Sequence, residues 1–296
     1  MSSSPDWQKV ASKIEQSTQI PFAIESVTPV SGGCINSAFI IQSKTHSYFI
    51  KLNQAKRLPM FKAEFDGLKE IAQTKTIKVP NPILYGVANS DAFLTLENTP
   101  LKYSNHQTDQ QLGTHLANLH SIKQSQFGWH QDNTIGSTQQ INNFSNDWVH
   151  FWQVNRLGFQ IALASNNGYA PSLIDSAEKL SDLVSCFFTT YTPQPSLLHG
   201  DLWAGNAGVT KQNQAIVYDP ACYYGDREAD IAMTELFGGF STHFYSAYNE
   251  AFPLDSGYKV RKNLYNLYHI LNHLNLFGRS YQRQAQDIIN SLLAEV

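Results

Sequence analysis

Two carboxylates and one amide have the types and spacing needed for chemistry at a bound metal and a reacting hydroxyl. Asp201 and Asn206 lie in the segment His199-Gly-Asp-Leu-Trp-Ala-Gly-Asn206, and Asp219 follows in Val217-Tyr-Asp-Pro-Ala221. A carboxylate such as Asp201 can orient an attacking hydroxyl and accept its proton. An amide oxygen and a second carboxylate are hard oxygen ligands, which Mg²⁺ prefers. These residues therefore predict metal-assisted transfer of a group to a hydroxyl.

The spacing of these residues resembles that of protein kinases, whose catalytic loop H-R-D-x-x-x-x-N is followed by a metal-binding Asp. Gly200 takes the place of the Arg in this chain. Phosphoryl transfer needs a nucleophile held in line and cations on the phosphate oxygens. Asp, Asn, Gly and Pro are also common in turns, so either segment alone would be explained as a turn. The eight-residue block with a second Asp at kinase spacing favours catalysis.

A lysine and a glutamate upstream match the second part of the kinase scheme. Lys51 ends the predicted strand segment Tyr48-Phe-Ile-Lys51, which resembles the V-A-I-K pattern, and Glu64 lies in a predicted helix. In kinases such a lysine holds nucleotide phosphates and pairs with the glutamate. Exposed side chains at a strand edge and on a helix are the usual alternative for these residue types. Their position upstream of Asp201 favours the nucleotide role.

Consecutive glycines in Ser31-Gly32-Gly33-Cys34 are the third candidate. Glycines let backbone N–H groups approach a phosphate closely, which predicts phosphate contacts for Gly32 and Gly33. The segment does not follow G-x-G-x-x-G, and an ordinary hairpin turn is the alternative. A thiol beside phosphate-binding amides is oxidisable, so Cys34 is a candidate redox residue, with a small filling residue as the alternative.

The apolar pattern of residues 1–97 predicts a small lobe of strands around one main helix. The expected strands are Glu25–Val30, Ala38–Gln42, Tyr48–Leu52, Ile83–Val87 and Ala92–Glu97, and the helix runs from Pro59 to about Thr74. Pro80 and Pro82 end this helical pattern.

Residues 98–296 predict a larger, mostly helical lobe, with the boundary near residues 97–101. The expected helices are Gln110–His120, Trp148–Ala164, Ser172–Tyr191 and a helical end from Ile231 through Leu293 with breaks near Gly239, Pro253 and Gly278. Short strands, Ser196–Leu198 and Ala215–Tyr218, flank the segment that carries Asp201 and Asn206. The strand and helix elements would thus hold the chemical residues on loops between them.

Composition excludes several classes of function. The chain has 296 residues, of which 42% are hydrophobic, enough to bury a sizeable core. The net charge of −3 and the lack of a basic stretch argue against a nucleic-acid partner. No apolar run is long enough to span a bilayer, and no secretory signal precedes the first strand. The three cysteines, Cys34, Cys186 and Cys222, are far apart, which favours a reducing cytoplasm. We expect a cytoplasmic protein, as a monomer or weak dimer.

Together these residues resemble the fructosamine-3-kinase family, also called ketosamine kinases. The matching segments keep the family's order over nearly the whole chain: Gly33-Cys-Ile35, Phe49-Ile-Lys-Leu-Asn53, Met60-Phe-Lys-Ala-Glu64, Phe127-Gly128, Asp147-Trp148, His199–Asn206, Tyr218-Asp-Pro-Ala221, Phe237-Gly-Gly-Phe240, Leu271-Asn-His-Leu-Asn275 and Phe277-Gly278. Related aminoglycoside and choline kinases usually carry a residue other than Trp203 after the Asp-Leu pair. The resemblance is therefore fairly specific.

The resemblance implies an α+β, bilobal, protein-kinase-like fold. A five-stranded antiparallel sheet with one main helix forms the N-lobe, and ATP binds between this lobe and the helical C-lobe. Asp201 is implied as the proton acceptor, and Asn206 and Asp219 as ligands of Mg²⁺. Lys51 would hold phosphates while paired with Glu64.

The family's hinge, which contacts adenine largely through backbone groups, falls on Glu97-Asn98-Thr99. Trp203 is implied as a wall of the sugar site, with packing as the alternative. Asp230 is implied to act near the substrate by ordering the catalytic loop. A carboxylate stabilised at a helix N-terminus is the alternative for Asp230. The segment 129–146 is variable in the family and is expected near the sugar.

The implied reaction is phosphorylation of the 3-hydroxyl of a ketoamine, the rearranged product of a sugar and an amine. Phosphate at carbon 3 is a good leaving group, so the adduct decomposes and releases the amine. The implied substrates are small ketoamines of the fructosamine or ribulosamine type, or glycated proteins.

Other functions stay open at this point. An aminoglycoside- or choline-type phosphotransferase would use the same residues but should have a more acidic substrate lobe. A nucleotide-binding pseudokinase or a non-kinase binding module would have no reason to keep the Lys, Glu, Asp, Asn and Asp set intact. His269 and His273 have metal-ligand spacing on one helix face, but no Glu follows the first His, so we expect an amphipathic core helix that shows polar groups to the cleft.

Overall fold

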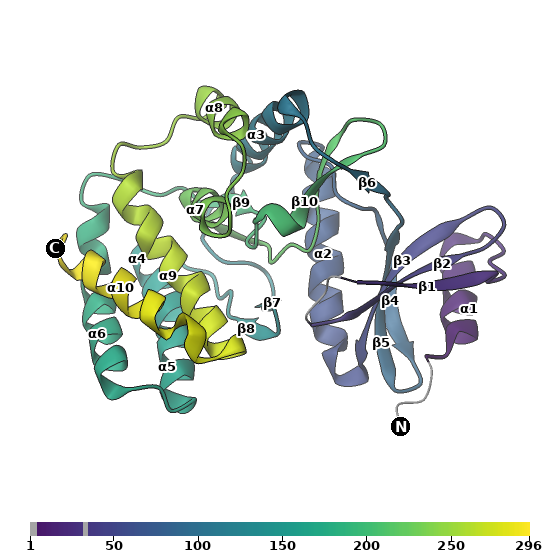
Figure 1. Cartoon of the computed structure of the whole chain (residues 1–296), viewed down its shortest axis with the longest axis horizontal. Coiled ribbons are helices and arrows are strands. Elements are labelled where there is room, and N and C mark those ends of the chain that lie inside the picture. The colour runs from purple at the N-terminus through teal and green to yellow at the C-terminus, as the bar shows by residue number, and fades with distance from the viewer. Residues whose placement is uncertain (1–4, 32–34) are drawn as a thin grey trace.

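The computed structural model describes residues 5–31 and 35–296 and has two parts (Figure 1). The first is a five-stranded antiparallel sheet in the order β1-β2-β3-β5-β4. Its strands are β1 (Ser26–Val30), β2 (Ser37–Gln42), β3 (Ser47–Gln54), β4 (Pro82–Ala88) and β5 (Asp91–Glu97). The five strands and their antiparallel pairing confirm the expected sheet.

Two helices cover the sheet, one on each face (Figure 1). They are α1 (Trp7–Thr18) and α2 (Leu58–Thr74), the latter preceded by the short 3-10 helix η1 (Ala55–Arg57). On β3, Tyr48, Ile50 and Leu52 pack in the cluster that includes α1. Successive side chains of a strand point to opposite faces, so Lys51 points to the face that α2 covers. The strand pattern therefore directs this lysine toward Glu64.

Helix α1 was not predicted. Its apolar residues, Trp7, Val10, Ala11 and Ile14, have the spacing of one helix face, and Val10 and Ile14 are fully buried. Asp6 caps the helix by accepting a hydrogen bond from the backbone N–H of Lys9 at 3.0 Å. The helical spacing is present in the sequence, and a single amphipathic segment before the first strand is the signal that indicates this helix.

The second part is mostly helical (Figure 1). Its helices are α3 (His106–His120), α4 (Trp148–Trp152), η2 (Gln153–Gly158), α5 (Phe159–Asn166), α6 (Pro171–Asp182), η3 (Val184–Phe188), η4 (Ala204–Asn206), α7 (Glu228–Leu236), α8 (Thr242–Ala251), α9 (Tyr258–Phe277), η5 (Arg279–Tyr281) and α10 (Gln282–Leu293). Its strands are β6 (Leu101–Lys102), β7 (Asn133–Ile135), β8 (Thr138–Gln140), β9 (Ser196–Leu198), β10 (Ala207–Thr210), β11 (Ala215–Val217) and β12 (Tyr223–Gly225). None of the helices formed by residues 5–31 and 35–296 is long and apolar enough to cross a membrane.

Most expected elements of this part are found, with changed ends. The predicted helix 148–164 is a continuous helical segment whose middle, η2, is a π-helix. The predicted helix 172–191 ends at Asp182 and is followed only by the short 3-10 helix η3. The C-terminal helices are separated near Gly239, Pro253 and Gly278, as expected. The β7–β8 hairpin and β12 were not predicted.

Candidate active site

The loop of residues 199–206 joins β9 to β10 and carries Asp201 and Asn206. Strand β10 pairs with β11, and beyond that pair the Tyr218 backbone N–H donates to the Asn206 carbonyl at 3.0 Å. Asp219 comes next in the chain, so the β10–β11 hairpin brings it beside Asn206. The Asn206 amide donates to the Asp201 carbonyl at 2.8 Å and lies 3.3 Å from Asp201 Oδ2. Local pairing thus gathers the three residues.

Lys51 reaches this group from the sheet. Its Nζ lies 2.6 Å from Glu64 Oε1 on α2 and 2.6 Å from Asp219 Oδ1. Lys51 is 6% exposed, whereas the Asp219 side chain is 44% exposed. The structure therefore brings together Lys51 and Glu64 from the first part and Asp219, Asn206 and Asp201 from the second.

The two carboxylates keep Lys51 charged. Burial by itself would lower the pKa of Lys51, but the charges of Asp219 and Glu64 outweigh it and hold this pKa above its ordinary value. Burial also raises the pKa of Glu64 to about 7, a change that Lys51 only partly opposes. A buried ammonium held between two carboxylates is a prepared site for phosphate oxygens, which can replace one of its partners.

Asp201 is a base suited to neutral pH. Burial, followed by the charge of Asp219, raises the pKa of Asp201 to about 7, and the hydrogen bond from Asn206 only partly opposes the change. A general base works best when its pKa lies near the operating pH. Asp201 is therefore able to accept a proton from a bound hydroxyl near pH 7.

Two backbone conformations shape the site. Gly200 has φ +84°, and a Cβ at this position would lie 2.1 Å from the Ala221 carbonyl oxygen, so only glycine fits. Asp219 has φ +59°, in the left-handed region that residues other than glycine seldom occupy. Such conformations persist where surrounding structure fixes them, frequently at functional sites. Here the close approach of the Gly200 and Ala221 segments and the Lys51 ion pair fix the Asp219 turn.

Asp230, in the first turn of α7, fixes the 199–206 loop by hydrogen bonds to its backbone. Its Oδ2 accepts from the His199 backbone N–H at 2.7 Å and its Oδ1 from the Gly200 N–H at 2.8 Å. Asp230 is 1% exposed, and His120 Nε2 lies 3.1 Å from its Oδ2. Burial alone would raise the pKa of Asp230, but its bonds to His120 and the loop lower it, so it stays ionised. These contacts favour a loop-ordering role over direct contact with a substrate.

His120 is a functional candidate that the sequence did not suggest. It is fully buried at the end of α3, and its Nδ1 lies 2.8 Å from the Tyr248 hydroxyl of α8. The signal available was a His closing an apolar helix, which is common in cores. Its link to Asp230 spans more than a hundred positions and becomes visible only in the fold.

Trp203 lies on the 199–206 loop between Asp201 and Asn206 and is 38% exposed. Its ring covers Gly205, where a Cβ would lie 2.3 Å from the Trp203 ring atom Cη2. The ring centroid is 6.3 Å from that of Phe237. Trp203 is thus placed at the surface beside Asp201 and is not part of the buried core.

The segment Glu97-Asn98-Thr99 leaves the end of β5 and leads toward β6. The Glu97 N–H donates to the Asn81 carbonyl at 2.8 Å, and the Asn98 side chain donates to Ser47 Oγ at 3.0 Å. Contact of Glu97, Asn98 and Thr99 with adenine stays a prediction. The predicted residues Gly32, Gly33 and Cys34 lie outside the described residues.

The β7–β8 hairpin supports the segment that follows Asp219. Asn133 Nδ2 donates to the Cys222 carbonyl at 2.8 Å, and Gln140 Nε2 lies 3.2 Å from the Ala221 carbonyl oxygen. Both side chains are buried. These two amides contact the backbone next to the metal-ligand candidate, and a place of the segment 129–146 near the sugar stays a prediction.

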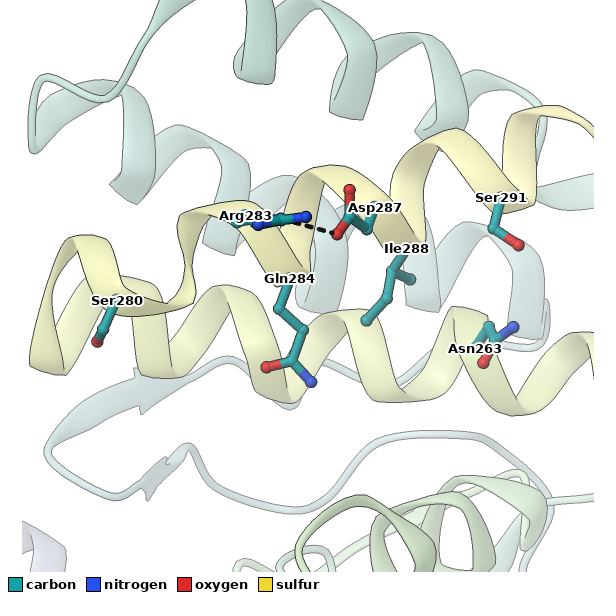
Figure 2. Close-up of a pocket in the computed structure, with 7 residues that line it drawn as sticks. All are labelled: Asn263, Ser280, Arg283, Gln284, Asp287, Ile288 and Ser291. Carbon is teal, nitrogen blue, oxygen red and sulfur yellow. Dashed lines mark ion pairs between the residues drawn. The ribbon is translucent and has the colours of Figure 1, made fainter.

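An open hollow lies away from this site, between α9 and α10. It has a volume of about 480 Å³ and is lined by polar side chains such as Asn263, Gln284 and Ser291, with Arg283 and Asp287 3.7 Å apart at its edge (Figure 2). A smaller cavity of about 230 Å³ adjoins the 199–206 loop at Ala204 and is lined by Asp109 of α3 and Phe240. Only the smaller one borders the site.

The donor set fits one Mg²⁺ shared with phosphate. No hydrogen bond from a described residue reaches Asn206 Oδ1, and Lys51 uses only Oδ1 of Asp219. Among residues 5–31 and 35–296, no three His, Cys, Asp or Glu side chains are grouped to hold a metal by themselves. A magnesium ion at Asn206 and Asp219 would therefore complete its shell with phosphate and water oxygens, as this ion commonly does.

The family model and two relatives that match this sequence carry names of ketoamine-type kinases. Residues 6–295 match the family model described as fructosamine kinase. A relative from Synechocystis sp. named a probable ketoamine kinase is 45% identical, over 97% of both chains. A chloroplastic protein-ribulosamine 3-kinase from Arabidopsis thaliana is 39% identical, over 91% of this chain and 83% of the relative.

Solved structures support the kinase-like fold. A candidate fructosamine-3-kinase from Haemophilus somnus superposes with a TM-score of 0.89 at 31% identity, covering 97% of both chains. The aminoglycoside phosphotransferase APH(4)-Ia, solved with AMP-PNP and hygromycin B, has a TM-score of 0.64 at 12% identity, covering 97% of this chain and 98% of that one. The latter likeness concerns the fold alone. The expected α+β, protein-kinase-like fold is confirmed.

Proposed function

This chain belongs to the fructosamine kinase family, and we propose that it transfers the γ-phosphoryl group of ATP to the 3-hydroxyl of a ketoamine. The observation that carries the proposal is the meeting at Lys51 Nζ of Glu64 and Asp219, each at 2.6 Å, with Asp201 and Asn206 adjoining. A phosphoryl-transfer site needs this combination of one cation, one base and two oxygen ligands.

In the proposed reaction Asp201 orients the substrate hydroxyl and accepts its proton as the oxygen attacks the γ-phosphorus. The bond from the γ-phosphorus to the bridging oxygen breaks, and ADP leaves. Lys51 exchanges its contact with Asp219 for phosphate oxygens while Glu64 keeps it in place. Asn206 and Asp219 hold Mg²⁺, which supplies charge neutralisation on the phosphates.

The chemistry of the phosphorylated ketoamine explains how the proposed reaction would repair a glycated amine. Phosphate at carbon 3 of the sugar is a good leaving group, and the phosphorylated adduct decomposes to release the free amine. Substrates are therefore fructosamine- or ribulosamine-type adducts of small amines or proteins. A cytoplasmic location and a monomer or weak dimer stay predictions for this chain.

Two alternatives have less support. An aminoglycoside phosphotransferase shares the fold at 12% identity, whereas the relatives with ketoamine and ribulosamine kinase names reach 45% and 39% over nearly the whole chain. A pseudokinase would be free to lose charged residues, yet the ion pairs of Lys51 with Glu64 and Asp219 are both present.

The test is an ATP-consumption screen with fructosamine, ribulosamine and erythrulosamine adducts of one amine, and with an aminoglycoside and choline as controls. We expect ADP formation with at least one ketoamine and a product phosphorylated at carbon 3 by phosphorus NMR. The variant Asp201→Asn should bind ATP but give no product. Turnover of only the aminoglycoside or choline would refute the proposal.

A further inference from the structure

Five aromatic side chains lie in contact with one another from the 199–206 loop to η5. Ring centroids are 6.3 Å apart for Trp203 and Phe237 and 4.8 Å apart for Phe237 and His273. His273 in turn neighbours both Phe277, at 5.4 Å, and Tyr281, at 5.1 Å, whose own rings are 6.5 Å apart. We call these five residues the aromatic row.

One end of the row is at the proposed transfer site, because Trp203 lies two positions after Asp201. The other end lies where α9 ends and η5 begins. A Cβ placed on Gly136 of the β7–β8 turn would lie 3.0 Å from Leu276 Cδ1 and 3.1 Å from Ile35 Cδ1. The last turn of α9 thus lies near Ile35 of the first part, and Figure 1 shows this helix end beside the β7–β8 hairpin. The row therefore follows the boundary between the two parts.

The row is only half covered. Trp203 is 38% and Phe277 50% exposed, and the other three members are half-buried. Burial lowers the pKa of His273, so its ring is neutral at pH 7 and the row carries no positive charge. Exposed ring faces without positive charge attract ammonium groups and bury alkyl or aryl chains. The row suits a ligand that has both features.

The amine part of a ketoamine has both features. Its nitrogen is attached to carbon 1, its carbonyl is carbon 2, and the reacting hydroxyl is on carbon 3. When that hydroxyl lies at Asp201, the nitrogen is only a few bonds away, and the chain beyond it must leave the site along the protein surface. Trp203 is the exposed ring nearest in sequence to Asp201 and begins a path of further rings.

Resting on the proposed function, we propose that the aromatic row binds the amine part of the ketoamine, both its protonated nitrogen and the alkyl or aryl chain beyond it. Trp203 and Phe237 contact the groups next to the nitrogen, and Phe277 and Tyr281 contact a longer chain. Selectivity for the amine then comes from the row, and selectivity for the sugar comes from elsewhere in the site.

The test compares adducts of one sugar with methylamine and with an amine that carries a phenyl ring at the end of a long alkyl chain, such as 8-phenyloctylamine. The long chain is needed because two further rings, Phe237 and His273, lie between Trp203 and Phe277. The variant Phe277→Ala should raise KM for the aromatic adduct about fivefold, because an aromatic contact contributes ~1 kcal/mol. The methylamine adduct should keep its KM, and kcat should stay the same for all adducts. Phe277→Tyr should restore the low KM.

Val154→Ala is the matched control, because Val154 of η2 is 52% exposed, almost as much as Phe277, and is outside both the row and the segment 129–146. It should leave every KM within twofold of the wild type. If Phe277→Ala changes KM equally for methylamine and aromatic adducts, or not at all, the row does not bind the amine, while the proposed function stands. If the wild type phosphorylates no ketoamine, both proposals fail.

Discussion

The carboxyl of Asp201 sets an expected pH dependence. Its pKa of about 7 means that half of the free protein carries a protonated Asp201 at neutral pH. The protonated form cannot accept the hydroxyl proton, so kcat/KM should fall as the pH drops below about 7 and level off above it. The measurement is kcat/KM against pH, with ATP as the varied substrate. A fall that begins only near the ordinary carboxyl pKa would contradict the assignment of Asp201 as the base.

The ionised carboxyl of Asp201 should lower the free energy of unfolding. Its pKa is raised in the folded state, so the folded protein binds this proton more tightly than the unfolded chain, and ionisation opposes folding. The neutral variant Asp201→Asn should therefore raise the free energy of unfolding at pH 8, on the order of 1–2 kcal/mol after allowance for partial exposure. The gain should shrink below pH 7 and vanish below the ordinary carboxyl pKa. Thermal unfolding at pH 8 and pH 4 measures it, and an equal gain at both would contradict the cause.

Asp219 should be the residue through which Mg²⁺ raises the affinity for ATP. Its Oδ2 is unused by Lys51, and half of the side chain is open, so a metal can bind without breaking the fold. In Asp219→Ala, Mg²⁺ should no longer strengthen ATP binding measured by calorimetry, whereas in the wild type it should do so at least tenfold.

The matched control for Asp219→Ala is Asp66→Ala. Asp66 makes a surface ion pair with Lys62 at 2.8 Å and lies outside the site. Its variant should keep the magnesium effect. An undiminished magnesium effect in Asp219→Ala would remove Asp219 from the ligand set.

The site residues could be predicted from sequence because their spacing is local. Asp201 and Asn206 share one loop, and one hairpin brings Asp219 to them. Lys51 and Glu64 could be predicted because a strand that ends in Lys, followed by a helix that carries Glu, resembles the kinase pattern. His120 could not be predicted, because its two partners come from α7 and α8, far away in the chain. The sequence around His120 shows only the spacing of an apolar helix face.

At the scale of elements, α3, α7 and α8 support the 199–206 loop through one buried hydrogen-bonded chain. Tyr248 contacts His120, His120 contacts Asp230, and Asp230 accepts from the backbone of His199 and Gly200. The side chains of Tyr248, His120 and Asp230 are all buried. The position of the loop therefore depends on side chains from three helices that lie outside it in the sequence.

We expect His120→Ala to lower kcat about tenfold, equivalent to ~1.4 kcal/mol, with little change in KM for ATP. His120→Gln keeps a donor near the position of Nε2 and should recover most of the loss. His120 would act as a positioning residue through Asp230. Equal damage from both variants, matched by equal losses of thermal stability, would indicate a purely structural role.

The π-helix η2 shows why some element ends could not be predicted. Arg156 within it is fully buried, with its guanidinium 4.1 Å from the Tyr223 ring centroid and 2.6 Å from the Ile141 carbonyl. An arginine is expected at the surface of a helix, and the periodicity of residues 148–164 fits an ordinary α-helix. Tertiary contacts of Arg156 with β12 and the β8 loop accompany the local widening. Sequence periodicity carries no trace of such contacts.

At the scale of the whole molecule, contacts near the site join the first part to the helical part. They include the Lys51–Asp219 ion pair and the hydrogen bond from the Val217 N–H to the Lys78 carbonyl at 3.0 Å. Because Val217 precedes Asp219 by two positions, both contacts fix the Asp219 segment against the first part. The lobe boundary at residues 97–101 stays a prediction.

Because several carboxylates surround Lys51, the binding of a divalent cation beside it should release protons. Lys51 offsets one of the carboxylates Glu64, Asp219 and Asp201, and the pKa values of Glu64 and Asp201 are raised to about 7. At pH 7 these two groups retain part of their protons, and an incoming divalent cation will expel them. Binding of Mg²⁺ with a nucleotide should therefore release a fraction of a proton, seen as an enthalpy that varies with the ionisation heat of the buffer. Asp201→Asn should diminish that dependence, so the molecule would acidify its solution slightly each time it is loaded.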